Sequence, residues 1–522
     1  MQTLGYFLAH YFHYFVYCLI AMLFLLSHRT GLFKDAIDDA KKDRLFFAAV
    51  CAVALLASLH CHALETLDYY DEQNYLLSAG NIAADNTNAL CYSADAGRCL
   101  EYHLMPHGLG LAAVYSLLYT PSFRLFYANA AVLNLLLYLI NAFLVYLAAQ
   151  RLFKDRFTAR CSCILLLMLP YNIMYAATVM PATLCLTLAL TAIYGSVCLA
   201  QRPQAGRSLR LLIAVSLMIL STVRVEYTIL LGPALAALLI KTGTKTGTRP
   251  FDRILTALAV VNLPACLLYT LGYLKQRMAA GGRLFGPGCL NASYFGSYLS
   301  SPSFVILSFF FLACLFYGRR AGGITLPRRP LLGLASLFFL LIAFYSFYNF
   351  PGVYRYTIPA SCIYALLAAA GMAATAERLP LSRTVGRRLM AAVVLLISLS
   401  FIRQACYEKG RLINDPARIC SARFLRMIDR ATLSRLLPDD PSKAYFSFKA
   451  PYLGQISSLN HITDLYVIGK LKRGATVYYI DNPFGGFRDS PLRDNNALRH
   501  ECVFRDDVCG SAVNRISLKR GP

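Results

Sequence analysis

Two adjacent carboxylates near the start of the chain have the types and spacing best suited to chemistry. Asp71 and Glu72 follow a long apolar run and open a polar segment. A carboxylate at a membrane surface can act as a general base toward the hydroxyl group of an acceptor. Tyr75 and Asn81 follow at helical spacing, which predicts a short helix over 71–81 lying along the membrane surface. We expect Asp71 and Glu72 to be catalytic and Tyr75 to contact substrate.

Three further polar residues, Glu101, His103 and His107, close the same segment. The two histidines are spaced i, i+4 and could hold a metal ion together with the acid. Two histidines and one acid without a clear helical frame are a weak metal pattern, so we assign all three residues to substrate binding. The sequence therefore names no cofactor, and a divalent metal is the weaker alternative.

Two arginines lie beside other polar residues at the ends of later apolar runs. Arg224 and Glu226 follow one run, and Arg355 and Tyr356 open another. A guanidinium group can bind a phosphate through two parallel hydrogen bonds. The alternative is that each arginine anchors its helix by extending toward the interface. We expect these four residues to bind substrate.

The composition defines the class of protein that must position these groups. The chain has 522 residues, of which 57% are hydrophobic and 15% are charged, a balance typical of a polytopic α-helical membrane protein. The formal net charge is +24, but the basic residues fall in small clusters between apolar runs. Such clusters set membrane topology, whereas a nucleic-acid site needs a continuous basic surface, so we expect no nucleic-acid partner.

The apolar runs predict about 11–12 transmembrane helices, because each is near the length that a bilayer core requires. The predicted spans cover 4–27, 45–64, 125–150, 160–178, 180–200, 210–223, 227–240, 254–274, 302–318, 330–349, 356–376 and 388–403.

Every second loop between these spans is basic, which indicates that these loops are cytoplasmic. The basic loops are 29–44, 151–160, 202–210, 241–253, 319–329 and 378–388. The alternate loops face the exterior: 65–124, the region around 179, 224–226, 275–301 and 350–355. All the candidate site residues then lie at one exterior level of the membrane.

The chain divides into two predicted parts. Residues 1–403 form the transmembrane domain, with 65–124 as its first exterior loop, and 404–522 form a small exterior α/β domain. In the second part, 444–449 and 476–480 are predicted strands, and 416–437 is a predicted helix.

The cysteines predicted to lie outside the cytoplasm could form disulfides or remain free, and the sequence does not decide their pairing. They are Cys91 and Cys99 in the first exterior loop and Cys406, Cys420, Cys502 and Cys509 in the tail.

Taken in order along the chain, these motifs resemble those of the GT-C glycosyltransferases. The greatest similarity is to the superfamily of protein O-mannosyltransferases and lipid A aminoarabinose transferases, and the motifs resemble those of glycosyltransferase family 39. The resemblance spans 65–376 and rests on Asp71-Glu72 with Tyr75, Pro106-His107-Gly108 before an aliphatic stretch, Arg224 with Glu226, and Arg355-Tyr356-Thr357-Ile358-Pro359.

The resemblance implies a hexosyl- or pentosyltransferase that takes a sugar from a polyprenyl-phosphate donor. The acceptor would be a lipid, a glycan or a protein on the exterior face of the membrane. Asp71 would be the base with Glu72 assisting, and Arg224 or Arg355 would hold the lipid phosphate. The corresponding location is a bacterial inner membrane with the active site facing the periplasm.

The sequence departs from that family at one position, which leaves the catalytic arrangement open. Many relatives carry a second acid between the fourth and fifth spans, but 170–181 contains no carboxylate here. Glu101 or Glu226 could substitute for it, or the chain could be a non-catalytic relative.

A transporter would place ionisable residues near the bilayer midplane, whereas those residues sit at span ends here. A lipid-linked glycan polymerase or ligase would rely on a late exterior loop, for which 275–301 is the candidate.

Overall fold

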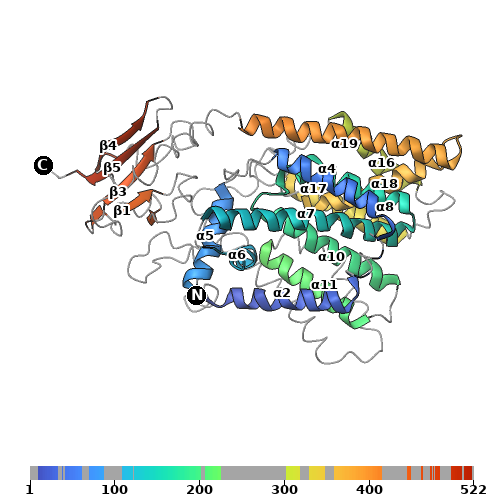
Figure 1. The fold of residues 1–522 in the computed structure, drawn as a ribbon, viewed down its shortest axis with the longest axis horizontal. Helices are drawn as coiled ribbons and strands as arrows, with labels where there is room; N and C mark the ends of the chain where they lie inside the picture. The colour runs from blue at the N-terminus through green and yellow to red at the C-terminus, as the bar shows by residue number, and fades with distance from the viewer. Residues whose placement is uncertain are drawn as a thin grey trace.

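A computed structural model of the chain shows a bundle of long helices and a small sheet near the C-terminus (Figure 1). The structure describes residues 10–32, 34, 38, 41–61, 70–86, 109–120, 123–201, 206–224, 301–317, 328–346, 358–413, 444–447, 460–462, 471–472, 474, 476–481, 495–507 and 511–519. Statements about the structure concern these residues.

The helices of the bundle follow the predicted spans closely. Their bounds are α2 Phe12–Arg29, α4 Arg44–Cys61, α7 Phe123–Phe153, α8 Arg156–Met168, α9 Pro170–Tyr175, α10 Pro181–Gln201, α11 Gly206–Val223, α16 Pro302–Tyr317, α17 Arg328–Ser346, α18 Ile358–Ala376 and α19 Arg383–Ile413. Within the described part of the chain, six helices are long and apolar enough to cross a membrane: α2, α4, α7, α10, α18 and α19. Shorter apolar helices lie in α11, α16 and α17. The protein is therefore a polytopic helical membrane protein, while the predicted spans 227–240 and 254–274 lie outside the described residues.

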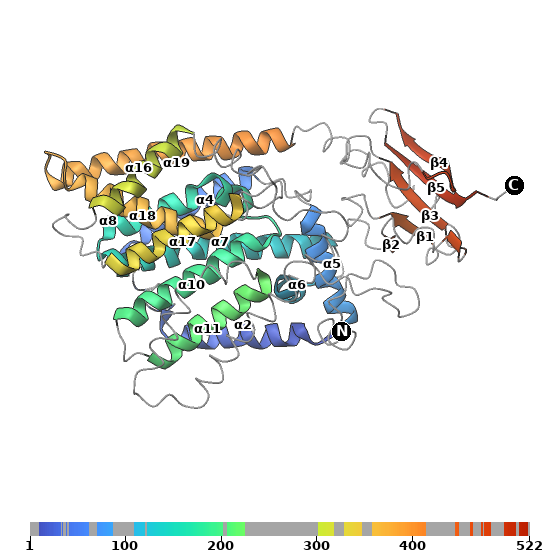
Figure 2. The same cartoon turned by 180° about the vertical axis from the view of Figure 1, so that it is seen from behind.

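Two helices run across the end of the bundle instead of along it. They are α5 (Tyr70–Asp85) and α6 (Leu109–Ser116), and both views show α5 transverse to the long helices (Figures 1 and 2). The helix predicted over 71–81 is thus confirmed and is longer at both ends. Its direction fits a segment that lies along a membrane surface.

The helix α2 supports both transverse helices. The Nε2 atom of His13 lies 2.9 Å from Oδ1 of Asn86, the residue that follows α5. Asn86 has a φ of 52°, a left-handed conformation that asparagine tolerates better than most residues. The hydroxyl groups of Tyr17 and Ser116, the last residue of α6, are 2.6 Å apart. These contacts fix the ends of α5 and α6 against a predicted membrane span.

The predicted span 160–178 is interrupted, which corrects the expectation of one continuous helix. The backbone leaves helical geometry at Leu169, with φ −56° and ψ 131°, between α8 and α9. The next residue is Pro170, whose ring disfavours helical ψ in the residue before it. The short helix α9 therefore begins as a separate element and leads into the connection 176–180 that precedes α10.

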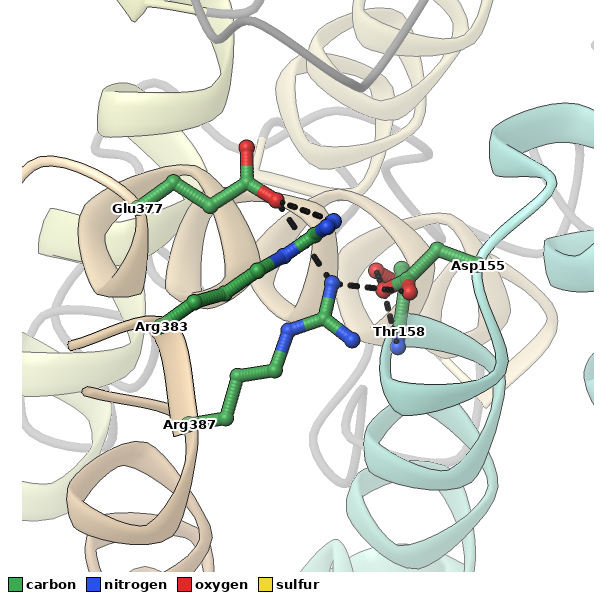
Figure 3. Close-up of polar contacts among 5 residues, drawn as sticks. All are labelled: Asp155, Thr158, Glu377, Arg383 and Arg387. Atoms are coloured by element: carbon green, nitrogen blue, oxygen red, sulfur yellow. Dashed lines mark hydrogen bonds and ion pairs between the residues drawn. The ribbon is translucent and has the colours of Figure 1, made fainter. Parts of the chain in front are cut away.

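Three predicted cytoplasmic loops meet at the other end of the bundle. Arg160 of α8 forms an ion pair with Asp43, 2.5 Å apart, next to the start of α4. Arg387 of α19 donates to Asp155 at 2.9 Å and also lies 3.5 Å from Glu377, as Figure 3 shows. The loops 29–44, 151–160 and 378–388 therefore share one end of the molecule, as their common basic character predicts.

Close backbone contact and aromatic packing hold the later helices together. A Cβ atom on Gly371 of α18 would collide with the carbonyl oxygen of Phe310 in α16, so the two backbones approach as closely as glycine permits. Phe338 of α17 stacks on Tyr364 of α18, with ring centroids 5.4 Å apart. These contacts place α16 and α17 against α18, whose side chains are almost all buried.

The C-terminal strands form one mixed five-stranded sheet beyond the end of the bundle where α5 lies (Figures 1 and 2). The strands are β1 Ala444–Ser447, β2 Asn460–Ile462, β3 Thr476–Asp481, β4 Leu498–Asp506 and β5 Ser511–Leu518, in the order β2-β1-β3-β5-β4. β1 is parallel to β2 and β3, and β5 is antiparallel to β3 and β4. Both predicted strands are confirmed as β1 and β3, and the predicted helix over 416–437 lies outside the described residues.

Candidate active site

One face of α5 is buried against the bundle and carries the candidate acid. Glu72, Tyr75, Leu76 and Ala79 are at most 1% exposed. Their spacing of i, i+3, i+4 and i+7 places them on a single face of a helix. Fully burying a carboxylate in an otherwise apolar face is costly unless it is hydrogen-bonded, so this position demands a specific partner.

That partner includes the backbone of the connection between α9 and α10. The N–H of Val179 donates a hydrogen bond to Oε1 of Glu72, with 2.6 Å between nitrogen and oxygen. Such charge-assisted bonds are short and about twice as strong as neutral ones. Many members of the family that the sequence resembles carry a second acid in the segment equivalent to 170–181. In this protein the same segment binds Glu72 of α5. Here the connection contributes a donor instead of a carboxylate.

A buried amide and a buried phenol hold the same connection from the other side. Nδ2 of Asn134 in α7 donates to the hydroxyl of Tyr115 at 2.8 Å and to the carbonyl oxygen of Thr178. The Tyr115 hydroxyl donates in turn to the carbonyl of Met180 at 3.5 Å. Burial raises the pKa of the Tyr115 phenol far above its ordinary value, and the nearby Glu72 carboxylate adds to this effect. Tyr115 is therefore a neutral hydrogen-bond donor.

The residue that follows α11, Arg224, brings a positive charge to this end of the bundle. The N–H of Arg224 continues the helical pattern with a 2.7 Å bond to Leu220, and the residue is only 4% exposed. Two residues earlier, Thr222 packs so closely on Gly110 of α6 that a Cβ atom there would collide with its side chain. The helix α6 also packs on α5. Both α5, which carries Glu72, and the end of α11 therefore contact α6.

The structure thus locates three of the predicted site residues and the backbone of a fourth. Glu72, Tyr75 and Arg224 are buried at the α5 end of the bundle, and Asp71 lies in the first turn of α5. The predicted site residues that lie outside the described residues are Glu101, His103, His107, Glu226, Arg355 and Tyr356. The metal alternative, which depends on the first three of these, stays a prediction.

Tyr115 and Asn134 were not identified from the sequence, although a signal for one of them is present. Asn134 and Asn141 are seven residues apart in a largely apolar span, and both are fully buried. Polar side chains inside a predicted span face the interior of the bundle and often mark function. Tyr115 carries no such signal, because tyrosine is abundant throughout this chain.

Comparison of the whole structure with solved structures shows its fold. The apo structure of ArnT from Cupriavidus metallidurans matches with a TM-score of 0.58 and 15% identity, covering 91% of this chain and 98% of that chain. The chain has the fold of ArnT. A structure of the same ArnT bound to undecaprenyl phosphate matches with a TM-score of 0.53, 15% identity and the same coverage.

A second solved protein shares this architecture. The apo oligosaccharyltransferase of Archaeoglobus fulgidus matches with a TM-score of 0.50 and 13% identity, over 84% of this chain and 69% of that chain. The likeness to the GT-C glycosyltransferases that the motifs indicate is therefore confirmed at the level of the fold. No protein-family model matches the sequence, and no curated protein matches it significantly.

Proposed function

We propose that the protein is a glycosyltransferase that moves a sugar from a polyprenyl-phosphate donor to an acceptor at the membrane surface. The observation that carries this proposal is the likeness to ArnT over 91% of the chain, since ArnT has been solved with undecaprenyl phosphate bound. The sugar is a hexosyl or pentosyl unit, and the acceptor is a lipid, a glycan or a protein. The fold and the position of the acid helix support this function over a transporter.

The reaction we propose needs a base for the acceptor and a cation for the departing phosphate. Asp71, in the first turn of the transverse helix α5, takes the proton from the acceptor hydroxyl as that oxygen attacks the anomeric carbon. Negative charge then develops on the polyprenyl phosphate as its bond to the sugar breaks. Arg224 stabilises this charge by electrostatic attraction, which strengthens where water is excluded.

We propose a positioning role for Glu72. Its Oε1 atom is bound to the N–H of Val179 inside the protein, and the residue is 0% exposed. A carboxylate held in this way fixes α5 against the α9–α10 connection, and so sets the position of the neighbouring Asp71. The missing second acid of 170–181 is then compatible with activity, because the connection is fastened to α5 by its backbone.

We further propose that the active site faces the side opposite the basic loops. The ion pairs of Asp43 and Asp155 gather those loops at one end of the bundle, whereas α5 and α6 cross the other end. By the positive-inside rule the basic end is cytoplasmic. In a bacterial inner membrane the α5 end would then face the periplasm, together with the domain proposed for residues 404–522.

Transfer from a panel of labelled polyprenyl-phosphate sugars in membranes tests this function. The wild type should consume one donor and place its label in a new product. Asp71→Asn should lose this activity by about 10²–10⁴-fold, the usual contribution of a general base, at equal expression. Arg224→Gln should raise the KM for the donor. Donor consumption by Asp71→Asn at the wild-type rate would overturn the assignment of the base.

Native membranes of the source organism should be included as a source of acceptor, so that the absence of donor consumption can be interpreted. The function would be rejected if, in their presence, the wild type still turned over no donor. Binding of polyprenyl phosphate to the purified protein provides a separate readout that does not require the acceptor.

A further inference from the structure

Two cysteines from distant parts of the chain meet where α4 packs against α19. The Sγ atoms of Cys61 and Cys406 are 3.5 Å apart, although 345 residues separate them in the sequence. Cys61 is the last residue of α4 and is 2% exposed, while Cys406 is partly exposed on α19. Disulfide sulfurs are about 2.05 Å apart, so the two Sγ atoms already lie within about 1.5 Å of bonding distance.

Both thiols lie at the same level of the bundle, far from its basic end. The helices α4 and α19 start beside the ion pairs of Asp43 and Glu377, so they run parallel from that end. Cys61 lies about 26 Å along α4 and Cys406 about 35 Å along α19, at 1.5 Å per residue. A bilayer core is about 30 Å thick, so the pair lies near the membrane surface at the α5 end.

We propose that Cys61 and Cys406 form a disulfide that fastens α19 to α4 in the mature protein. The proposal goes beyond the transfer reaction and rests on the α5 end facing an oxidising compartment, where disulfides persist. Two S–H bonds break and one S–S bond forms. The two protons and two electrons pass to an exterior thiol–disulfide oxidoreductase, whose own S–S bond breaks to give its dithiol.

The link would act at the point where the chain leaves the membrane. The helix α19 continues to Ile413, ten residues past the predicted end of that span, and the strands of the sheet follow it in the chain (Figure 1). Cys406 is therefore a helical residue held against α4, not a residue of a loop. Its disulfide would tie the exit of α19 to the helix that immediately precedes the segment leading to α5.

Mass spectrometry of the full-length protein tests the proposal. Cells are quenched in acid, free thiols are alkylated under denaturing conditions, and the purified protein is digested without reduction. We expect a linked pair of peptides that contain Cys61 and Cys406 and separate on reduction. Alkylation of both residues before reduction, or a link from Cys406 to another cysteine, would overturn the proposal.

Single serine variants sharpen this test without depending on transfer activity. Cys61→Ser should leave Cys406 open to the first alkylating reagent, and Cys406→Ser should do the same for Cys61. Cys51→Ser removes a thiol from the same helix and serves as the matched control, in which the linked peptides should persist. Reduction should lower the unfolding temperature of the wild type more than that of Cys61→Ser; equal shifts in both proteins would count against the link.

Discussion

The carboxylate of Glu72 and the backbone N–H of Val179 meet at 2.6 Å although the two residues are 107 positions apart in the sequence. This bond joins the transverse helix α5 to the connection between α9 and α10. Glu72 is completely buried, so its carboxylate is part of the packing between α5 and this connection and is not a solvated surface group. The neighbouring Asp71 therefore lies in the first turn of a helix whose position is fixed relative to two predicted membrane spans.

Replacing Glu72 should separate its structural role from the chemistry assigned to Asp71. In Glu72→Ala the buried N–H of Val179 loses this acceptor, which should cost about 1–3 kcal/mol and lower the unfolding temperature in detergent. Glu72→Gln keeps an acceptor oxygen at the same chain length and should retain most of the stability. Asp71→Asn should unfold like the wild type while losing transfer. An unchanged unfolding temperature in Glu72→Ala would contradict the framework role.

The contact between α6 and α11 can be tested with a matched pair of glycines. A methyl group at Gly110 would collide with the side chain of Thr222 and lie 3.0 Å from its carbonyl carbon, so Gly110→Ala should displace the end of α11. At Gly80, inside α5, the same methyl group would meet a ring carbon of Tyr119 at 3.7 Å, an ordinary contact. Gly80→Ala should therefore be neutral or stabilising by up to about 1 kcal/mol, because alanine favours a helix more than glycine does.

Thermal unfolding and donor binding would distinguish these two variants. Gly110→Ala should lower both the unfolding temperature and the affinity for a polyprenyl phosphate, since Arg224 lies two residues past Thr222. Equal behaviour of the two alanine variants would mean that the α6–α11 contact does not position the site.

The sequence was sufficient to predict the bundle because hydrophobic length and basic loops are local signals. The acid helix could be predicted for the same reason, from the spacing of residues after Asp71. The break at Leu169 could have been inferred from Pro170 alone, but the length of the apolar run favoured one continuous span. The length of an apolar run does not show whether its backbone forms one helix or is interrupted.

The interior of the site could not be predicted from spacing along the chain. Glu72 meets Val179, and Asn134 meets Tyr115 and Thr178, only after three helices and the α9–α10 connection have packed together. The proximity of Cys61 to Cys406 has the same origin, because it depends on how α4 lies against α19. The sequence singled out Glu72 as a candidate site residue, but its partner in the structure is a backbone N–H that no residue type reveals.

The ion pairs at the basic end should be energetically coupled. Oδ2 of Asp155 accepts a bond from the N–H of Thr158 at 2.9 Å and so caps α8, while Oδ1 accepts from Arg387 (Figure 3). Asp155→Asn keeps a good helix cap but removes the charge. A double-mutant cycle of Asp155→Asn with Arg387→Gln should give a coupling of about 0.5–3 kcal/mol in unfolding free energy.

The exposed neighbour Arg383 provides the control for that cycle. It contacts Glu377 at 2.8 Å but no atom of Asp155 among the contacts of the described residues. Arg383→Gln should therefore show little coupling to Asp155→Asn. Equal coupling for the two arginines would indicate a general charge effect at this end of the bundle instead of a specific pair.

The pair of Asp43 and Arg160 should make stability depend on pH. The hydrogen bond from Arg160 lowers the pKa of the Asp43 carboxyl below its ordinary value of 3.8, and a bond from Tyr146 at 2.6 Å acts in the same direction. Because the pKa is lower in the folded state, the unfolded chain binds this proton more readily. The resulting stabilisation is complete above the unfolded pKa and is lost as the pH falls through the folded pKa.

Unfolding temperatures measured from pH 7 to strongly acidic solution would reveal this contribution as a difference between variants. Arg160→Gln removes the largest cause of the lowered pKa, so it should be less stable than the wild type at pH 7. The gap between the two proteins should narrow as Asp43 becomes protonated in acid. Tyr146→Phe keeps the arginine and should show a smaller gap with the same direction. A gap that stayed constant down to the lowest pH would mean that the Asp43 charge does not contribute to the stability of this end of the bundle.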